Sequence, residues 1–213
     1  MVWGPPNVGK SFVTLDFACS IATGNDWLGR SVEPGRVVYI AGEGVSGYRR
    51  RLQAWLRFNA LTEEDLQNLS FIGWPVQLHE GVESLLRLVR PEDPSLIIID
   101  TLAASTLGVA EDSSEGVGPT IGSLLTLRKE LDSAIMVVHH TGWDEKHERG
   151  SSSYRGAMDT SIEVKAVSGK RKQLICHKQR DAEIFNPIYF RLHEVRWQSS
   201  KGTEIQSLVP SLI

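Results

Sequence analysis

The sequence predicts an α/β fold, in which a central and mostly parallel sheet is flanked by helices and extended by antiparallel strands at its C-terminal edge. Between residues 36 and 138, short β-branched runs alternate with stretches of helical periodicity, which is typical of a parallel sheet covered by helices. After residue 160, apolar and polar residues alternate, as in antiparallel strands. The 213 residues, 41% of them hydrophobic, suffice for one domain of this kind.

The chain begins with a phosphate-binding pattern, because residues 4–11 match G-x-x-x-x-G-K-[ST]. Glycines allow a tight loop whose backbone N–H groups surround phosphate oxygens, and the N-terminus of the following helix favours anions. We expect Lys10 to reach the β- and γ-phosphates and Ser11 to hold Mg²⁺. The residues expected to bind the nucleotide are Gly4, Pro5, Pro6, Asn7, Val8, Gly9, Lys10, Ser11 and Phe12.

Only Met1, Val2 and Trp3 precede this loop, so the first strand is either very short or cut by a start inside a longer protein. The helix after the loop has an apolar face between Phe12 and Ile21 and a stop at Gly24–Asn25. Further helices are expected at 46–58, 82–89 and 117–131, and strands at 36–41, 70–72, 96–99, 134–138, 161–167, 173–176 and 188–192. The folded domain is expected to span residues 1–198, followed by a polar, frayed C-terminal tail at 199–213.

Composition limits the classes of function. A formal charge of −3 gives no general attraction to nucleic acid, so any such binding must come from a local cluster. Residues 164–180 form one, with six basic residues and no acidic residue, although a solvated hairpin around the turn at 168–172 explains it equally well. Cys19 and Cys176 are expected to be apolar core residues in a reducing compartment. Without an apolar run of about 18 residues, a cytosolic protein with no membrane partner is expected.

Asp100 ends the apolar strand at 96–99 and is the expected second half of the phosphate site, where it would orient a Mg²⁺-bound water. The residue after it is Thr101, so a catalytic Glu directly following the Asp is absent, and the base must come from elsewhere. The best candidate is Glu43, which lies between two glycines just after the strand at 36–41.

His139 and His140 end the strand at 134–138 and point to opposite faces, so the two histidines cannot easily share one role. His140 is the candidate sensor of the γ-phosphate. A zinc site is disfavoured because Cys176–His177 lacks ligand spacing. Two weakly patterned loops, at 102–118 and 141–156, follow the carboxyl ends of buried strands, where ligands bind in open α/β sheets. The second, rich in Gly, Ser and charge, is expected to be poorly ordered.

Six segments in this order resemble one family: the phosphate loop, Gly42–Gly44, Ile98–Leu102, His139–Gly142, Gly150–Ala157 and Lys178–Asp181. The chain resembles, from Gly4 to about Trp197, the RecA-like P-loop ATPases of the replicative-helicase branch, most closely the RepA-type hexameric helicases of plasmids and phages. Two departures are the very short first strand and the equal numbers of acidic and basic residues between 141 and 155.

The resemblance implies a RecA-like ATPase domain that hydrolyses ATP with Mg²⁺. It makes Glu43 the catalytic base and His140 the sensor of the γ-phosphate. Lys178 and Arg180 would reach the nucleotide of a neighbouring subunit in a homo-oligomer, expected to be a hexameric ring. The loops after Asp100 and His140 would face a central channel for single-stranded DNA, and other replication proteins are further candidate partners.

Three alternatives remain open from the residues alone. A monomeric P-loop phosphotransferase would need an arginine-bearing lid, whereas Arg49–Arg51 are expected on a solvated helix face. A nucleotide-gated interaction subunit without hydrolysis would tolerate loss of Glu43 or Arg180, and both are present. For Arg180 itself, the alternative is an ordinary surface salt bridge with Asp181 or Glu183.

Overall fold

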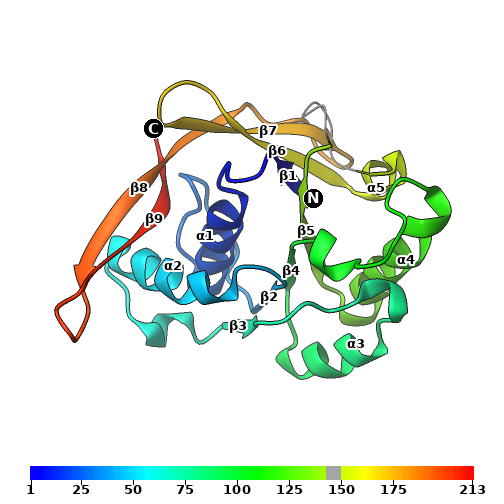
Figure 1. The fold of residues 1–213 in the computed structure, drawn as a ribbon, viewed down its shortest axis with the longest axis horizontal. Coiled ribbons are helices and arrows are strands. Elements are labelled where there is room, and N and C mark those ends of the chain that lie inside the picture. Colours follow the sequence, from blue (N-terminus) through cyan, green and yellow to red (C-terminus); the bar gives the residue numbers. More distant parts are fainter. Residues whose placement is uncertain (143–149) are drawn as a thin grey trace.

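A computed structural model describes residues 1–142 and 150–213 as a single nine-stranded sheet with helices on both faces (Figure 1). The strand order is β3-β2-β4-β5-β1-β6-β7-β8-β9. The strands are β1 (Val2–Gly4), β2 (Val37–Ala41), β3 (Leu69–Ile72), β4 (Leu96–Asp100), β5 (Ala134–His140), β6 (Thr160–Ala166), β7 (Arg171–Gln179), β8 (Ile188–Gln198) and β9 (Glu204–Leu212). The α-helices are α1 (Lys10–Thr23), α2 (Val45–Phe58), α3 (Glu83–Val89), α4 (Ser114–Leu131) and α5 (Ser152–Ala157).

The first six strands of this order, from β3 to β6, pair in parallel. The sequence predicts this for the strands up to β5, but the expectation of an antiparallel strand at 161–167 is only half right, because β6 is parallel to β1 and antiparallel to β7. Alternation of apolar and polar residues indicates that one face is less buried, and it does not fix the direction of the neighbouring strand. Every residue of β2 and β4 is buried, because helices cover both faces of the sheet there. Helices α1 and α2 pack on one face, around Leu15 and Trp55. Helices α3, α4 and α5 lie on the other face. The short first strand is also observed, since β1 has three residues.

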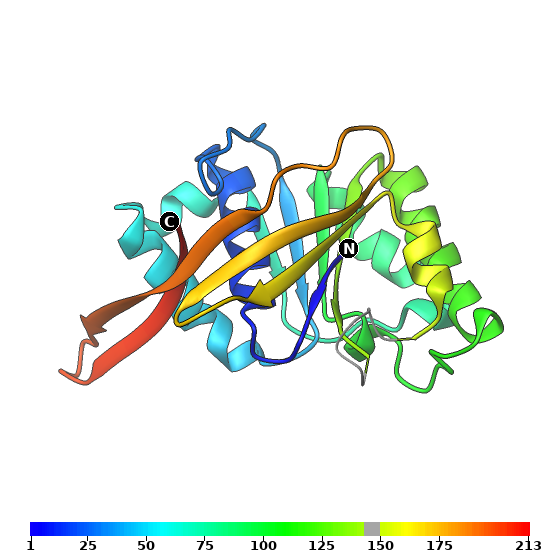
Figure 2. The ribbon, with the colours of Figure 1, turned by 90° about the horizontal axis from the view of Figure 1, so that it is seen from above.

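The last three strands, β7, β8 and β9, are antiparallel to their neighbours. The prediction of a frayed tail at 199–213 is wrong. Residues 204–212 form β9, which pairs with β8 along its whole length, and Val209 is buried against the α1 and α2 side of the sheet (Figure 2). The composition of this segment resembles a tail because a two-stranded ribbon with one packed face is polar at every second position, which lowers its average hydrophobicity.

The helix α5 corrects the expectation that 141–156 is poorly ordered, as far as the structure describes that segment. Tyr154 is fully buried in the core beside α4, and the Ser151 side chain accepts a hydrogen bond from the Ser153 amide at the start of the helix. Residues 150–156 are therefore held by one aromatic side chain and a cap. Residues 143–149 lie outside the described part of the chain.

Both cysteines are buried and unbonded, in agreement with their expected place in the core. Among the described residues, none of the helices combines the length and apolarity needed to cross a lipid bilayer.

Helices α1 and α2 are joined by a buried polar contact that makes stability depend on pH. The indole Nε1 of Trp55 donates to Asp16 Oδ1 at 2.8 Å, and burial raises the pKa of Asp16 from 3.8 to about 7. A carboxyl whose pKa is raised by folding stabilises the protein below its unfolded pKa, and this contribution disappears as the pH rises through the folded pKa. Stability should therefore fall between about pH 4 and pH 7.

We predict that Asp16→Asn removes this pH dependence, because the amide keeps an oxygen for Trp55 and cannot ionise. At pH 8 the variant should have a free energy of unfolding higher than the parent by about 1–3 kcal/mol. Urea denaturation between pH 4 and pH 8 measures both curves. Parallel curves for the two proteins would contradict the prediction.

Candidate nucleotide-binding site

The phosphate loop joins β1 to α1 at the carboxyl edge of the parallel strands. Gly9 has a φ of 107°, which a side chain would strain. Gly4, with a φ of 154°, lies so close to β6 that a Cβ atom would stand 2.3 Å from the carbonyl oxygen of Val164. Both ends of the loop thus require glycine, and the loop turns directly into the first turn of α1 as the motif predicts.

Lys10 is the first residue of α1, directly after the loop, and it is nearly buried. Its Nζ donates to the carbonyl oxygens of Gly4 and Pro5 at 2.9 Å each. Burial lowers the pKa of Lys10 to about 8, against the opposing effect of Asp100 and Glu43. A buried ammonium group whose nearest acceptors are neutral carbonyls would gain strongly from a phosphate oxygen, so the cradle fits an anionic ligand.

His140 lies beside this lysine. It is paired with Gly4 in the sheet, and its Nδ1 lies 3.3 Å from Lys10 Nζ. His139 points to the other face, where it is buried with its ring against that of Tyr154 at 5.7 Å. The alternation of the strand therefore brings only His140 to the phosphate loop, as the sequence indicates.

Asp100 is buried at the end of β4 and is held by two tyrosines that sequence reasoning missed. Its Oδ2 accepts hydrogen bonds from the hydroxyls of Tyr39, at 2.6 Å, and Tyr48, at 2.8 Å. The Tyr39 hydroxyl also lies 3.0 Å from Thr14 Oγ1 on α1. Burial raises the pKa of both tyrosines, which keeps their hydroxyls protonated as donors. A tyrosine inside the otherwise apolar β2 was the available signal, since a buried phenol needs a polar partner.

Glu43 follows β2 and lies at the same edge. The Gly42 amide donates to the Asp100 carbonyl at 2.7 Å, so the turn after β2 is fixed to the end of β4. Glu43 is exposed, and its Oε1 accepts a hydrogen bond from Thr101 Oγ1 at 2.9 Å. The carboxylate is therefore oriented on one oxygen and open to solvent, and it is close enough to Lys10 to affect its pKa.

Arg51 differs from the solvated helix face that we expect for Arg49–Arg51. Its guanidinium lies over the rings of Phe12, at 4.6 Å, and Tyr48, at 4.8 Å. Phe12 therefore packs against α2 and holds a positive charge next to the start of α1. Arg49 is exposed, as predicted.

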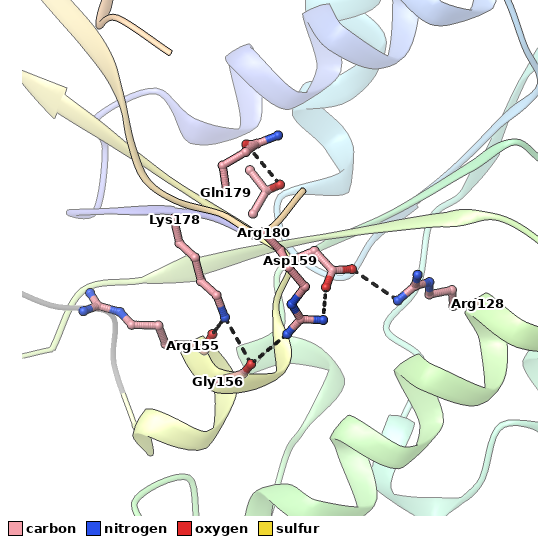
Figure 3. Close-up of polar contacts among 8 residues, drawn as sticks. Arg128, Arg155, Gly156, Asp159, Lys178, Gln179 and Arg180 are labelled. Atoms are coloured by element: carbon pink, nitrogen blue, oxygen red, sulfur yellow. Dashed lines mark hydrogen bonds and ion pairs between the residues drawn. The ribbon is translucent and has the colours of Figure 1, made fainter. Parts of the chain in front are cut away.

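Lys178 and Arg180 lie elsewhere (Figure 3). Because β7 runs antiparallel to β6, it ends beside Asp159, about five residues or roughly 16 Å from the level of Gly4. Arg180 forms an ion pair with Asp159, which also pairs with Arg128 at 3.2 Å. The salt bridge of Arg180 is thus made with Asp159, rather than with Asp181 or Glu183.

In the same cluster, Lys178 Nζ donates to the carbonyl oxygens of Arg155, at 2.8 Å, and Gly156, at 3.1 Å (Figure 3). The structure therefore brings Lys10, Ser11, Glu43, Asp100 and His140 to one edge of the sheet, and Lys178 with Arg180 to the opposite edge.

A cavity of about 630 Å³ also lies at that opposite edge, lined mainly by aliphatic side chains such as Leu96 and Ile135, and is separate from the phosphate loop.

The comparisons with known proteins agree with this geometry. Residues 1–146 match the family model of an AAA domain, and the chain belongs to this family. The crystal structure of the RadB recombinase resembles the fold with a TM-score of 0.65, over 90% of this chain and 86% of that chain, at 17% sequence identity. No curated protein sequence matches the chain. The chain is thus an AAA domain by family, with a RecA-like P-loop fold.

We predict that the Tyr48 hydroxyl and the Asp100 carboxylate are energetically coupled, because a buried hydrogen bond to a charged acceptor is stronger than one to a neutral acceptor. A double-mutant cycle of Tyr48→Phe and Asp100→Asn, followed by urea denaturation, should give a coupling energy of about 1–2 kcal/mol. Tyr154→Phe combined with Asp100→Asn is the control, since Tyr154 lies on the other face, and should give additive effects. Additive effects in the Tyr48 cycle would contradict the coupling.

Proposed function

We propose that the protein is an ATP-hydrolysing motor or loader that acts on single-stranded DNA in plasmid or phage replication or in recombination, of the RepA-type hexameric helicase kind. The observation that supports it best is the gathering of Lys10, His140, Asp100 and Glu43 around one phosphate loop. Under this proposal the nucleotide site is completed by an adjoining copy of the chain.

In this function the P-loop amides and Lys10 hold the β- and γ-phosphates of ATP, which replace the loop carbonyls as acceptors for the lysine. Ser11 and Asp100 would hold Mg²⁺, which neutralises charge on the phosphates when bound. The residues fit this ion, since the tyrosine hydroxyls occupy Asp100 Oδ2 and leave Oδ1 available.

Glu43 suits the role of the base. The hydrogen bond from Thr101 fixes one carboxylate oxygen, so the other can accept the proton of the attacking water. His140 lies close enough to Lys10 to donate to the γ-phosphate. Since the Thr141 amide donates to Gly4 at 3.2 Å, a movement of His140 would pass directly to the loop that follows β5.

The DNA contact is proposed for the loops that follow β4 and β5, because both leave the sheet at the phosphate edge. The name of RadB as a recombinase is in keeping with a DNA substrate. A small-molecule kinase is less favoured, because it would need arginines on a lid. Arg51 instead belongs to helix α2 and packs against Phe12 of α1.

We predict that Lys10→Ala abolishes ATP binding, because it deletes the charge-assisted contact to the phosphates. Glu43→Gln should keep binding and lose turnover by about 10²-fold or more, since an amide cannot accept the proton. Fluorescent-nucleotide titration and a phosphate-release assay measure the two effects. Glu64→Gln, an exposed glutamate in another segment, serves as the control. Hydrolysis by Glu43→Gln at the parental rate would place the base elsewhere.

The proposed shared site depends on Arg180. Its own P-loop lies at the opposite edge of the sheet, so Arg180 could act only on the nucleotide of a neighbouring subunit, after leaving Asp159. An arginine supplied in trans stabilises charge on the transferring phosphoryl group, and this raises the rate of hydrolysis by about 10³-fold or more. Lys178 leaves the same end of β7 and would accompany it.

We predict that Arg180→Ala and Lys10→Ala subunits, each inactive alone, recover part of the ATPase activity when mixed at a concentration that sustains oligomers. Some interfaces would then pair an intact P-loop with an intact arginine. Native mass spectrometry verifies that mixed oligomers form. Mixed oligomers without recovery, or a fully active Arg180→Ala protein, would reject the shared site.

A further inference from the structure

The outer face of the β6–β7–β8 hairpins is basic. Four cations, Lys165, Lys170, Arg171 and Arg191, are exposed there together with Tyr189, and we call these five residues the basic face. They belong to three strands and one turn, and no described helix covers them (Figure 2).

The pairing register places the strand residues on the same side of the sheet. Arg171 is directly opposite Arg191, and Gln173 is opposite both Lys165, on β6, and Tyr189, on β8. The intervening positions Val164, Leu174 and Phe190 are buried on the inner side. Because strand residues alternate between faces, Lys165, Arg171, Arg191 and Tyr189 share one outer surface, and Lys170 lies in the turn directly before Arg171.

The charges of this face are not balanced within the described chain. Two arginines directly opposite each other repel and destabilise the strand pair. The nearby acids are engaged elsewhere, since Glu163 is buried and bound to His177 at 2.8 Å, and Glu194 pairs with Arg196. Across residues 1–142 and 150–213, no carboxylate lies within ion-pair distance of the four cations. An external anion bound at this face would therefore offset the repulsion between its cations.

The aromatic ring tells which kind of anion fits. The Arg171 guanidinium lies over the Tyr189 ring at 5.1 Å, and the residue Tyr189 remains 38% exposed. A planar cation stacked on an exposed ring is a platform on which nucleic-acid bases can stack, whereas an acidic peptide or a lipid headgroup gains nothing from it. The face also lies near the phosphate loop, since β6 runs parallel to β1 and Gly4 packs against Val164.

We propose that the basic face binds single-stranded nucleic acid, with the four cations on phosphates and a base on the Arg171–Tyr189 platform. The site is distinct from the loops after β4 and β5, and the proposal does not require ATP hydrolysis. It extends the proposed function with a second contact that would hold a strand along the outside of the sheet.

The first test compares a triple variant, Lys165→Gln with Arg171→Gln and Arg191→Gln, with the parent and a matched control. The control, Arg49→Gln with Lys129→Gln and Lys201→Gln, removes the same charge from exposed positions elsewhere. Binding of a fluorescent oligo-dT is measured at several salt concentrations. The slope of log K against log salt should become shallower by about 2 in the triple variant, since each phosphate contact contributes about 0.7 for a single strand. An unchanged slope and affinity would overturn the proposal.

ATP hydrolysis without DNA is measured on the same proteins. The triple variant should keep the parental rate, because the basic face takes no part in the phosphate site. A second outcome is a parent that shows no hydrolysis and a triple variant that binds oligo-dT more weakly than the parent. That result would reject the proposed function and support the basic face as a binding site for nucleic acid.

The second test addresses stacking with Tyr189→Leu, an exposed change whose fold is checked by thermal melting. The variant should bind oligo-dT at least about fivefold more weakly than the parent. Its affinity for an abasic strand of equal length should equal that of the parent. An equal loss for both strands would overturn the base platform. Competition by polyglutamate or anionic vesicles as effective as that by oligo-dT would overturn the assignment to nucleic acid.

Discussion

The three residues of β1 hold the candidate site together. Gly4 pairs with His140 on β5 and packs against Val164 on β6, and Trp3 is buried with its Nε1 donating to Ser161 at 2.9 Å. This short strand places the phosphate loop between the two neighbouring strands. If β1 were displaced by one residue, each of its side chains would change face, and Lys10 would lose its place beside His140.

Around this loop, the charged groups act on one another because they are removed from water. Lys10 is poorly solvated, and Asp100 is buried with two tyrosine hydroxyls as partners. In a low dielectric, such pairs depend on accurate placement, and an unpaired member is costly. The network joins α1, β2, α2 and β4, so binding of a phosphate at Lys10 would change the electrostatic environment of several core elements.

The antiparallel strands give the sheet two chemically different ends. At one end of β7, Lys178 and Arg180 are held by carbonyl groups and by Asp159. At the other end, Arg171 is opposite Arg191 and lies over the Tyr189 ring, on the basic face. One strand thereby separates a group proposed to act on a neighbouring subunit from a surface proposed to bind nucleic acid.

The sequence by itself determined the features that local pattern encodes. These are the P-loop, the buried strands ending in Asp100 and His140, and the exposed Glu43 between its glycines, because motif spacing and strand alternation are properties of short segments. The tertiary structure alone decided which side chains meet across the fold. Tyr48 reaches Asp100, Arg180 pairs with Asp159, and β9 completes the sheet, because these contacts join segments distant in the chain. Their partners are set by strand order and helix packing, which no local pattern contains.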